Sequence, residues 1–382
     1  MPGFLIMALE SVPVLDLSRQ YKNLLPEVNR AMTRVVESGA FILGPDVNLF
    51  EREVAQWMGS KFCLGVSNGT DALFIALRAL GIKPNDQVLS SPFTFFATVS
   101  ATVNSGAEPV FADIDPLTFN LDPNQVEAVL KKDKLKKIKA IIPVHLYGQA
   151  CDMEALVTLA NKYQVALVED ACQSIGAEIQ KKKTGNWGHV GCFSLYPTKN
   201  LGAVGDAGIV TTQDADLYEK ALSIRNHGSK IRYVHDLIGS NFRIDTVQAA
   251  ALRVFLPHLD EWIRARQNAA SYYDEKLARL DWIRIPARAR FSTHTFHQYT
   301  IRVLSNRREE LQKYLSDKKI GHAVYYPIPC HLQKALQSLQ YKPGDFPVAE
   351  KAAQEVLSLP LFPGITTPEQ DYVVGAIAEF FN

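Results

Sequence analysis

The sequence has few cysteines, almost no net charge and no long apolar run, and each shortage excludes a class of protein. Its 382 residues include 41 Lys and Arg against 40 Asp and Glu, which gives a formal net charge of +1. Without an excess of basic residues the chain has no long-range attraction for nucleic acid or an acidic membrane, so neither partner is expected. Disorder is excluded as well, because net charge is low and 47% of residues are hydrophobic.

The cysteines are scattered and odd in number, and none forms a Cys-x-x-Cys pair: Cys63, Cys151, Cys172, Cys192 and Cys330. This spacing predicts neither a zinc site nor a disulfide framework, so no metal is expected. Free thiols are typical of a reducing compartment. The apolar run at residues 3–9 is too short to cross a bilayer. We therefore expect a cytoplasmic protein.

Short apolar runs alternate with helical stretches between about residues 60 and 215. The runs predict strands at 62–67, 87–91, 109–114, 140–145, 165–169, 191–195 and 208–212, and the stretches predict helices at 71–80, 97–105, 123–132 and 153–163. Several runs are apolar throughout, as in strands that helices cover on both faces. The alternation predicts an α/β fold with a mostly parallel sheet.

After about residue 255 this alternation stops. A helical pattern covers 249–280, and Pro257 is expected to kink or break it. A strand at 299–303 and helices at 308–318 and 368–381 follow. We therefore predict two domains, a large one over residues 1–255 and a smaller α+β domain over residues 256–382.

Two segments at predicted strand ends are candidates for ligand contacts, one of them with a phosphate. Ser67-Asn68-Gly69-Thr70-Asp71 joins a strand to a helix, and the free N–H groups at a helix start attract phosphate, although an ordinary helix cap also explains the segment. Asp170 ends an apolar run, and ligands of open α/β sheets bind beyond the carboxyl ends of the strands. Its alternative role is to cap the following turn.

Lys199 lies in a loop between Pro197 and the glycines 202, 205 and 208. A lysine in a crowded pocket loses hydration, so its pKa falls and its neutral amine can attack a carbonyl. The alternative is an exposed loop lysine. With the phosphate segment and Asp170, Lys199 completes what pyridoxal phosphate requires: a lysine for the Schiff base, an acid at the pyridine nitrogen and a helix start for the phosphate.

These segments resemble the DegT/StrS family of fold-type I, pyridoxal-phosphate-dependent nucleotide-sugar aminotransferases. The resemblance runs from Val14 to the C-terminal helix. It rests on Phe41-Ile42-Leu43-Gly44-Pro45, Gly69-Thr70-Asp71-Ala72-Leu73, Pro92-Phe93-Thr94-Phe95-Phe96-Ala97-Thr98, Pro143-Val144-His145-Leu146-Tyr147-Gly148, Glu169-Asp170-Ala171-Cys172-Gln173, Thr198-Lys199-Asn200-Leu201-Gly202 and Gly239-Ser240-Asn241-Phe242-Arg243-Ile244-Asp245. It implies a mostly parallel central sheet flanked by helices, with a smaller C-terminal domain.

The resemblance also implies a role for each matching residue. It makes Lys199 the Schiff-base lysine and Asp170 the partner of the pyridine nitrogen. Asn241 matches an Asn that reaches the cofactor of the neighbouring subunit, which implies a homodimer. The other implied cofactor contacts are Gly69, Thr70 and Ser194 with the phosphate, Phe95 with the ring face and Gln173 with the ring hydroxyl.

Substrate contacts are predicted from two further segments. Arg243 is expected to bind a substrate oxyanion, because its guanidinium offers a bidentate fork. The stretch 325–333 resembles one typical of members that act on 3-keto sugars, although Tyr325 stands where His is common. It suggests Tyr325, Tyr326 and His331 as substrate contacts. A rigid packed turn is the alternative, and His331 by itself is better explained as a packed, hydrogen-bonded residue.

We therefore expect an aminotransferase that moves an amino group from L-glutamate to a keto carbon of a nucleotide-linked sugar, in amino-sugar biosynthesis. C3 is favoured over C4. One alternative is a dehydratase of the same fold, but related dehydratases carry His in place of the lysine, so Lys199 favours transamination. The other is a non-catalytic regulator, against which the intact Lys199, Asp170 and phosphate segment argue.

Overall fold

A seven-stranded sheet forms the centre of the molecule, which is described over residues 11–381 by a computed structural model. In sheet order the strands are β1 (Phe62–Val66), β9 (Gly208–Thr212), β8 (Val190–Ser194), β5 (Ala166–Asp170), β4 (Ile138–Ile142), β2 (Gln87–Ser90) and β3 (Glu108–Phe111). Every strand predicted before residue 215 is therefore confirmed. The apolar run at residues 3–9 lies outside the described residues.

The predicted mostly parallel sheet is confirmed, and a single strand, β9, runs antiparallel to its neighbours. Strands β3, β2, β4, β5 and β8 pair in parallel, whereas β9 is antiparallel to both β8 and β1. The connection from β8 to β9, residues 195–207, contains no helix. A parallel neighbour would require a long crossover, so this loop returns the chain antiparallel to β8.

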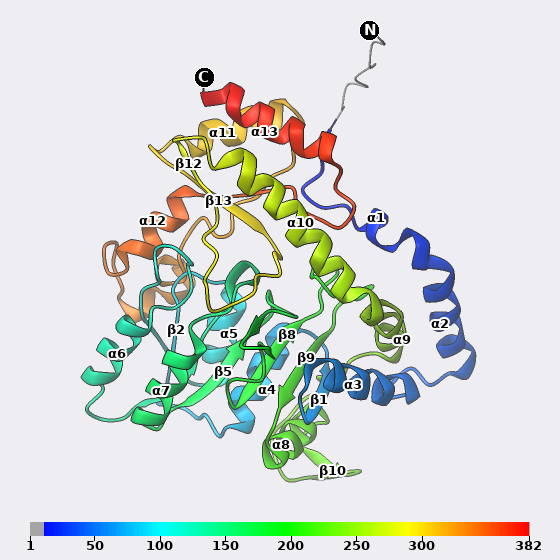
Figure 1. The fold of residues 1–382 in the computed structure, drawn as a ribbon. Coiled ribbons are helices and arrows are strands. Elements are labelled where there is room, and N and C mark those ends of the chain that lie inside the picture. The colour runs from blue at the N-terminus through cyan, green and yellow to red at the C-terminus, as the bar shows by residue number, and fades with distance from the viewer. Residues whose placement is uncertain (1–10, 382) are drawn as a thin grey trace.

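Helices cover both faces of the sheet (Figure 1). Val88 packs on the side of α4 (Gly69–Ala79), α5 (Phe96–Asn104) and α8 (Ala215–Arg225). The next residue, Leu89, packs on the opposite side with α6 (Pro123–Lys132) and α7 (Met153–Tyr163). Successive strand residues point to opposite faces, so a strand covered on both faces is apolar at neighbouring positions, as at Val88 and Leu89. The apolar core beside β8 and β9 is completed by α2 (Leu25–Ser38), α3 (Pro45–Met58) and α9 (Thr246–Phe255).

The helical pattern over 249–280 breaks at Pro257, as predicted. Helix α9 ends at Phe255, a 3₁₀ turn η3 (Leu256–His258) follows, and α10 (Leu259–Leu277) continues the chain. Proline has no N–H to donate and clashes with the preceding turn, which explains the break. The predicted boundary at residue 255 coincides with this break, and the division into two domains stays a prediction.

Beyond the break, a three-stranded antiparallel sheet is formed in the order β12 (Ile283–Arg284), β13 (Tyr299–Val303) and β14 (Val356–Leu359). It packs with α10, α11 (Arg308–Asp317) and α13 (Thr367–Phe381), and α12 (Pro347–Glu355) precedes β14. Val12, near the start of the described chain, belongs to the same core and pairs with Ile320. The early chain thus packs against the C-terminal part.

The remaining elements are short. They are α1 (Leu17–Tyr21), the strand pairs β6 (Glu178–Ile179) with β7 (Lys182–Lys183) and β10 (Ser229–Ile231) with β11 (Val234–His235), and the 3₁₀ turns η1 (Lys22–Leu24), η2 (Leu146–Gly148), η4 (Cys330–Leu332) and η5 (Lys334–Leu339). Within residues 11–381, no helix combines the length and apolar character that crossing a bilayer requires.

Candidate active site

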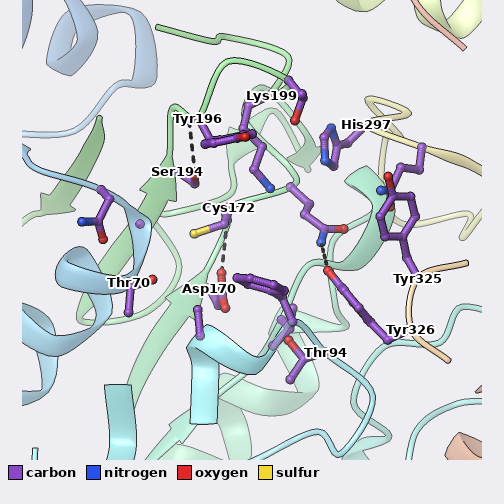
Figure 2. Close-up of a pocket in the computed structure, with 18 of the residues that line it drawn as sticks. Thr70, Thr94, Asp170, Cys172, Ser194, Tyr196, Lys199, His297, Tyr325 and Tyr326 are labelled. Carbon is purple, nitrogen blue, oxygen red and sulfur yellow. Dashed lines mark hydrogen bonds between the residues drawn. The ribbon is translucent and has the colours of Figure 1, made fainter. Parts of the chain in front are cut away.

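A cavity of about 820 Å³ opens beyond the carboxyl ends of β5 and β8, between the central sheet and the small antiparallel sheet (Figure 2). Open α/β sheets bind their ligands at this edge. Most of the residues predicted from the sequence line it: Gly69, Thr70, Phe95, Asp170, Gln173, Ser194, Lys199, Tyr325 and Tyr326.

Lys199 enters the cavity from the loop between β8 and β9. The backbone N–H of Lys199 donates to Tyr196 O at 2.8 Å, which closes a tight turn. A Cβ on Gly202 would lie 2.2 Å from Pro197 O, so only glycine allows the loop to fold back this closely. Burial lowers the pKa of the Lys199 amine, and the negative charge of Asp170 opposes this in part. The structure therefore supports a reactive lysine and not an exposed one.

Asp170 is the last residue of β5 and is 5% exposed. Its Oδ2 accepts a hydrogen bond of 2.7 Å from Thr98 Oγ1, and its Oδ1 accepts one of 3.3 Å from Cys172 N. The Thr98 hydroxyl lies 2.9 Å from that of Thr94, so a short chain of hydroxyl groups fixes the carboxylate. A carboxylate held in this way can accept the N–H of a protonated pyridine ring.

The start of α4 forms a backbone cradle. The Asn68 side chain caps the helix by accepting from Asp71 N at 2.9 Å. A Cβ on Gly69 would lie 2.7 Å from Ser194 Cβ and 3.0 Å from Cys172 Sγ, so the absence of a side chain there allows close packing. Thr70 and Ser194 line the cavity beside this helix start, where free N–H groups favour a phosphate.

Gln173 is held at both ends of its amide. Its Oε1 accepts from Tyr147 N at 2.7 Å, and its Nε2 donates to Tyr326 Oη at 3.0 Å. The Phe95 ring is 57% exposed and lies 6.0 Å from the Tyr326 ring between centroids. These side chains form one wall of the cavity, and an exposed ring face at this wall can stack on a planar ligand.

Three predicted site residues do not line this cavity. Asn241 is exposed, and Arg243 pairs through its backbone with Val66 at the end of β1. His331 is buried, and its Nε2 lies 3.1 Å from a carboxylate oxygen of Glu350. The structure therefore places His331 in a packed network and not in the cavity.

Other lining residues were not predicted. Arg266, His297 and Gln298 approach from α10 and from the segment before β13, and Asp206 and Cys172 also line the cavity. No local motif marks Arg266, which stands in an ordinary amphipathic helical pattern. The only sequence signal was the helix itself, and it could not show which side faced a ligand.

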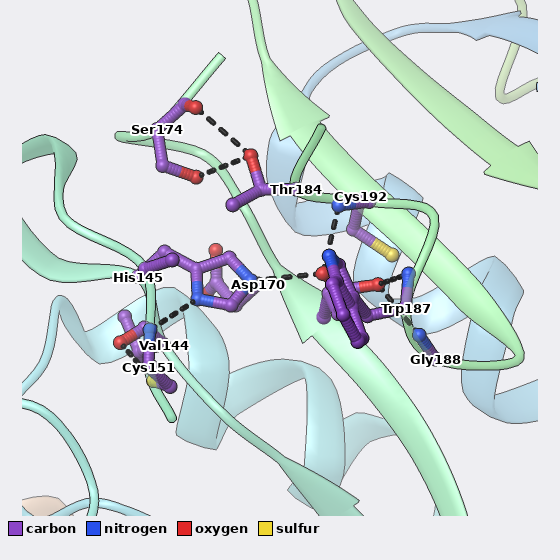
Figure 3. A network of polar contacts seen from close by, with 12 residues as sticks. Val144, His145, Cys151, Asp170, Ser174, Thr184, Trp187, Gly188 and Cys192 are labelled. Atoms are coloured by element: carbon purple, nitrogen blue, oxygen red, sulfur yellow. Dashed lines mark hydrogen bonds and ion pairs between the residues drawn. The ribbon is translucent and has the colours of Figure 1, made fainter. Parts of the chain in front are cut away.

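A buried polar network lies behind Asp170 (Figure 3). The Glu169 carboxylate accepts backbone N–H bonds from Gly185, Trp187 and Gly188 at 2.6–2.8 Å and lies 3.0 Å from His145 Nε2. Because Cys151 N donates to His145 Nδ1 at 3.0 Å, the His145 proton sits on Nε2 and points at Glu169. This network fixes the end of β5, and with it Asp170.

These features fit pyridoxal phosphate. The glycine cradle at Gly69 suits its phosphate, the fixed Asp170 carboxylate suits its pyridine nitrogen, and the buried Lys199 amine suits its aldehyde. The three sites line a single cavity.

Comparisons with known proteins agree with this geometry. Residues 23–378 match the DegT/DnrJ/EryC1/StrS aminotransferase family. The pleiotropic regulatory protein of Geobacillus stearothermophilus is 48% identical over 97% of this chain and 99% of its own length. The UDP-N-acetyl-3-dehydro-alpha-D-glucosamine 3-aminotransferase of Acidithiobacillus ferrooxidans is 41% identical over 92% of this chain and 93% of its own.

A solved structure is also closely similar. The crystal structure of S. venezuelae DesV in complex with a ketimine intermediate is 39% identical, covers 97% of this chain and 99% of its own, and superposes with a TM-score of 0.93. The match in sequence and in fold leads to one conclusion. The chain belongs to the DegT/DnrJ/EryC1/StrS aminotransferase family, whose members depend on pyridoxal phosphate.

Proposed function

We propose that this protein transfers the amino group of L-glutamate to the C3 keto carbon of a nucleotide-linked sugar, in amino-sugar biosynthesis. The observation that carries the proposal is the placement of the Lys199 amine and the fixed Asp170 carboxylate in one cavity. The preference for C3 is supported by the Acidithiobacillus relative, which is named as a 3-aminotransferase.

Lys199 is proposed as the group that moves the proton. Its lowered pKa leaves more of the amine neutral than in an exposed lysine. With the cofactor bound, the amine would take the proton from the α-carbon of the donor and return it to the cofactor carbon C4′, on the other side of the donor nitrogen. Pyridoxal phosphate supplies an electron sink for the charge left on that carbon. Asp170 stabilises the cationic ring that makes this possible, and Thr98 keeps the carboxylate in place.

We propose that Gly69, Thr70 and Ser194 bind the cofactor phosphate and that Phe95 covers the ring face. Gln173 keeps its proposed contact with the ring hydroxyl, through the amide hydrogen that is not donated to Tyr326. Tyr325 and Tyr326 line the cavity and are proposed to contact the sugar. His331 is proposed only as a structural residue, because its ring is paired with Glu350.

The protein is further proposed to act as a cytoplasmic homodimer. Asn241 and Arg243 lie outside the cavity of their own chain, as expected for residues that serve a partner's site. The segment that carries them adjoins exposed apolar side chains, since Ile42 pairs with Asp245 and both Phe41 and Ile42 are about half exposed. Exposed apolar surface beside functional residues favours an interface there.

Product analysis tests the regiochemistry. The purified enzyme is incubated with glutamate and a panel of 3-keto and 4-keto nucleotide sugars, and NMR locates the new C–N bond. Amination at C3 is expected, and amination only at C4 would overturn the preference.

The homodimer is tested by mixing two variants, Lys199→Ala and Asn241→Ala, each of which is impaired alone. When their subunits exchange at random, the mixture should regain up to about a quarter of the parental activity. No regain in exchanged dimers would contradict a shared site.

A regulatory role is the second candidate, because the Geobacillus relative is named a pleiotropic regulatory protein. A regulator has no need for a buried lysine and a fixed carboxylate in one cavity, which is why transamination is preferred. Purified protein that stays colourless after addition of pyridoxal phosphate would support the regulator. Turnover of a keto sugar without any amino donor would support the dehydratase.

A further inference from the structure

One wall of the cavity carries polar atoms that have no hydrogen-bond partner among residues 11–381. Arg266 Nε, His297 Nδ1 and Gln298 Oε1 are all buried without a hydrogen bond, and all three residues line the cavity that Lys199 enters. Buried polar atoms are almost always paired in folded proteins, so three unpaired ones mark this wall as polar and incompletely satisfied by the protein itself.

Arg266 makes this wall positive. It is 1% exposed, and its Nη1 donates to the carbonyl oxygens of Phe296, His297 and Leu361 at 3.1–3.3 Å. These carbonyl oxygens fix the position of the guanidinium, but they are uncharged and do not neutralise its positive charge. Among residues 11–381 it forms no ion pair with a carboxylate, including the three acidic side chains that line the cavity, Asp71, Asp170 and Asp206. A buried cation without a counter-charge is costly unless a ligand supplies one.

His297 adds a neutral donor beside the lysine. Figure 2 shows its ring near the Lys199 side chain, with Asp170 across the cavity. Burial lowers the pKa of His297, and the positive charges of Lys199 and Arg266 lower it further, so the ring stays neutral with one N–H to donate. The amide of Gln298, whose oxygen and nitrogen can exchange places by a flip, offers another donor.

We propose that Arg266, His297 and Gln298 form the subsite for the α-carboxylate of the amino-acid donor. The inference rests on the proposed transamination, because the donor's α-carbon must lie within reach of the Lys199 amine and its carboxylate is bonded directly to that carbon. The wall next to Lys199 offers donors and a positive charge, which a carboxylate requires and a sugar hydroxyl does not.

The test compares two amines that differ only in this carboxylate. 2-Methylglutamate has no α-proton to lose and binds without reacting further. In 4-amino-4-methylpentanoate a methyl group replaces the α-carboxylate, so this amine also has no proton to lose at that carbon. Their dissociation constants are measured on the cofactor-loaded enzyme by absorbance titration or calorimetry. In Arg266→Gln we expect 2-methylglutamate to bind roughly 10- to 100-fold more weakly, as for the loss of charge-assisted hydrogen bonds. Binding of 4-amino-4-methylpentanoate and the KM for the keto sugar should change less than about threefold.

The control is Arg264→Gln, which removes the same charge from an exposed position of the same helix and should leave both constants unchanged. Equal weakening of the two amines, or no weakening of either, would overturn the proposal. If Arg266→Gln does not fold because three carbonyls lose their donor, His297→Phe and Gln298→Leu take its place. Each should weaken 2-methylglutamate selectively by roughly 3- to 10-fold, and the absence of that selectivity in both variants would again overturn it.

Failure of this inference and failure of the proposed function are distinguishable. If the wild-type protein does not aminate a keto sugar with glutamate, the proposed function fails. If it does, and the variants keep the wild-type preference for 2-methylglutamate, only the carboxylate subsite is wrong.

Discussion

Glu169→Gln tests the network that fixes the end of β5. Glu169 is completely buried and its two oxygens accept four hydrogen bonds, two at each oxygen. All four partners are donors, because the backbone N–H of Cys151 occupies His145 Nδ1 and confines the His145 proton to Nε2. A glutamine has one oxygen and one NH₂ group, so in either orientation the NH₂ faces two donors.

The expected cost follows from this count. Hydrogen bonds to a charged group contribute roughly 1.5–3 kcal/mol each, so losing two costs about 3–6 kcal/mol. Part of this cost falls on the loop of Gly185, Trp187 and Gly188, whose amides bond directly to Glu169. At about 1.4 kcal/mol per factor of ten, the amides of this loop should exchange with solvent roughly 100- to 10,000-fold faster.

Hydrogen exchange followed by mass spectrometry on peptides covering residues 182–190 measures this change. The control is Glu127→Gln, which breaks ion pairs with the exposed Lys131 and Lys162 and should leave the exchange of the loop unchanged, because solvent screens such pairs. A loop that exchanges less than tenfold faster in Glu169→Gln would refute the reasoning, because the carboxylate would then not be what holds it.

Three further predictions concern the cofactor site. Lys199→Ala should abolish the cofactor adduct that borohydride fixes to the chain and lower transamination by at least about 100- to 10,000-fold; an adduct of unchanged yield would show that another residue carries the cofactor. In the cofactor-free protein, burial lowers the pKa of Lys199, so its amine is protonated below that pKa and neutral above it. Acetic anhydride at pH 8–9 should therefore label Lys199 faster than exposed lysines of ordinary pKa. If the labelling rate of Lys199 had the same pH dependence as that of the exposed lysines, the lowered pKa would be contradicted. Gly69→Ala should weaken binding of pyridoxal phosphate at least roughly tenfold, because the added Cβ meets Ser194 Cβ at 2.7 Å; equilibrium titration measures this against Gly375→Ala, where an added Cβ meets nothing within 4 Å.

Much of the fold could be predicted because its signals are local. Strands covered on both faces are apolar at successive positions, so the runs at residues 87–91 and 208–212 predicted β2 and β9 directly. Pro257 predicted the break between α9 and α10 for an equally local reason. The direction of β9 was not readable, since it depends on which neighbour the strand pairs with and not on its own residues.

The same division holds for the site. Lys199, Asp170 and the segment 67–71 each follow or end a strand, and strands of a parallel sheet bring such positions to one edge, so the sequence by itself determined the cofactor side of the cavity. Only the tertiary structure decided the opposite wall. Arg266 reaches the cavity from a helix almost 70 residues after Lys199, and its partners are backbone carbonyls of two distant segments. His331 shows the converse, because a motif placed it near the substrate and a contact with Glu350 holds it in the core. Contacts between distant segments leave no periodic pattern in the chain, and they become visible only when the fold brings the segments together.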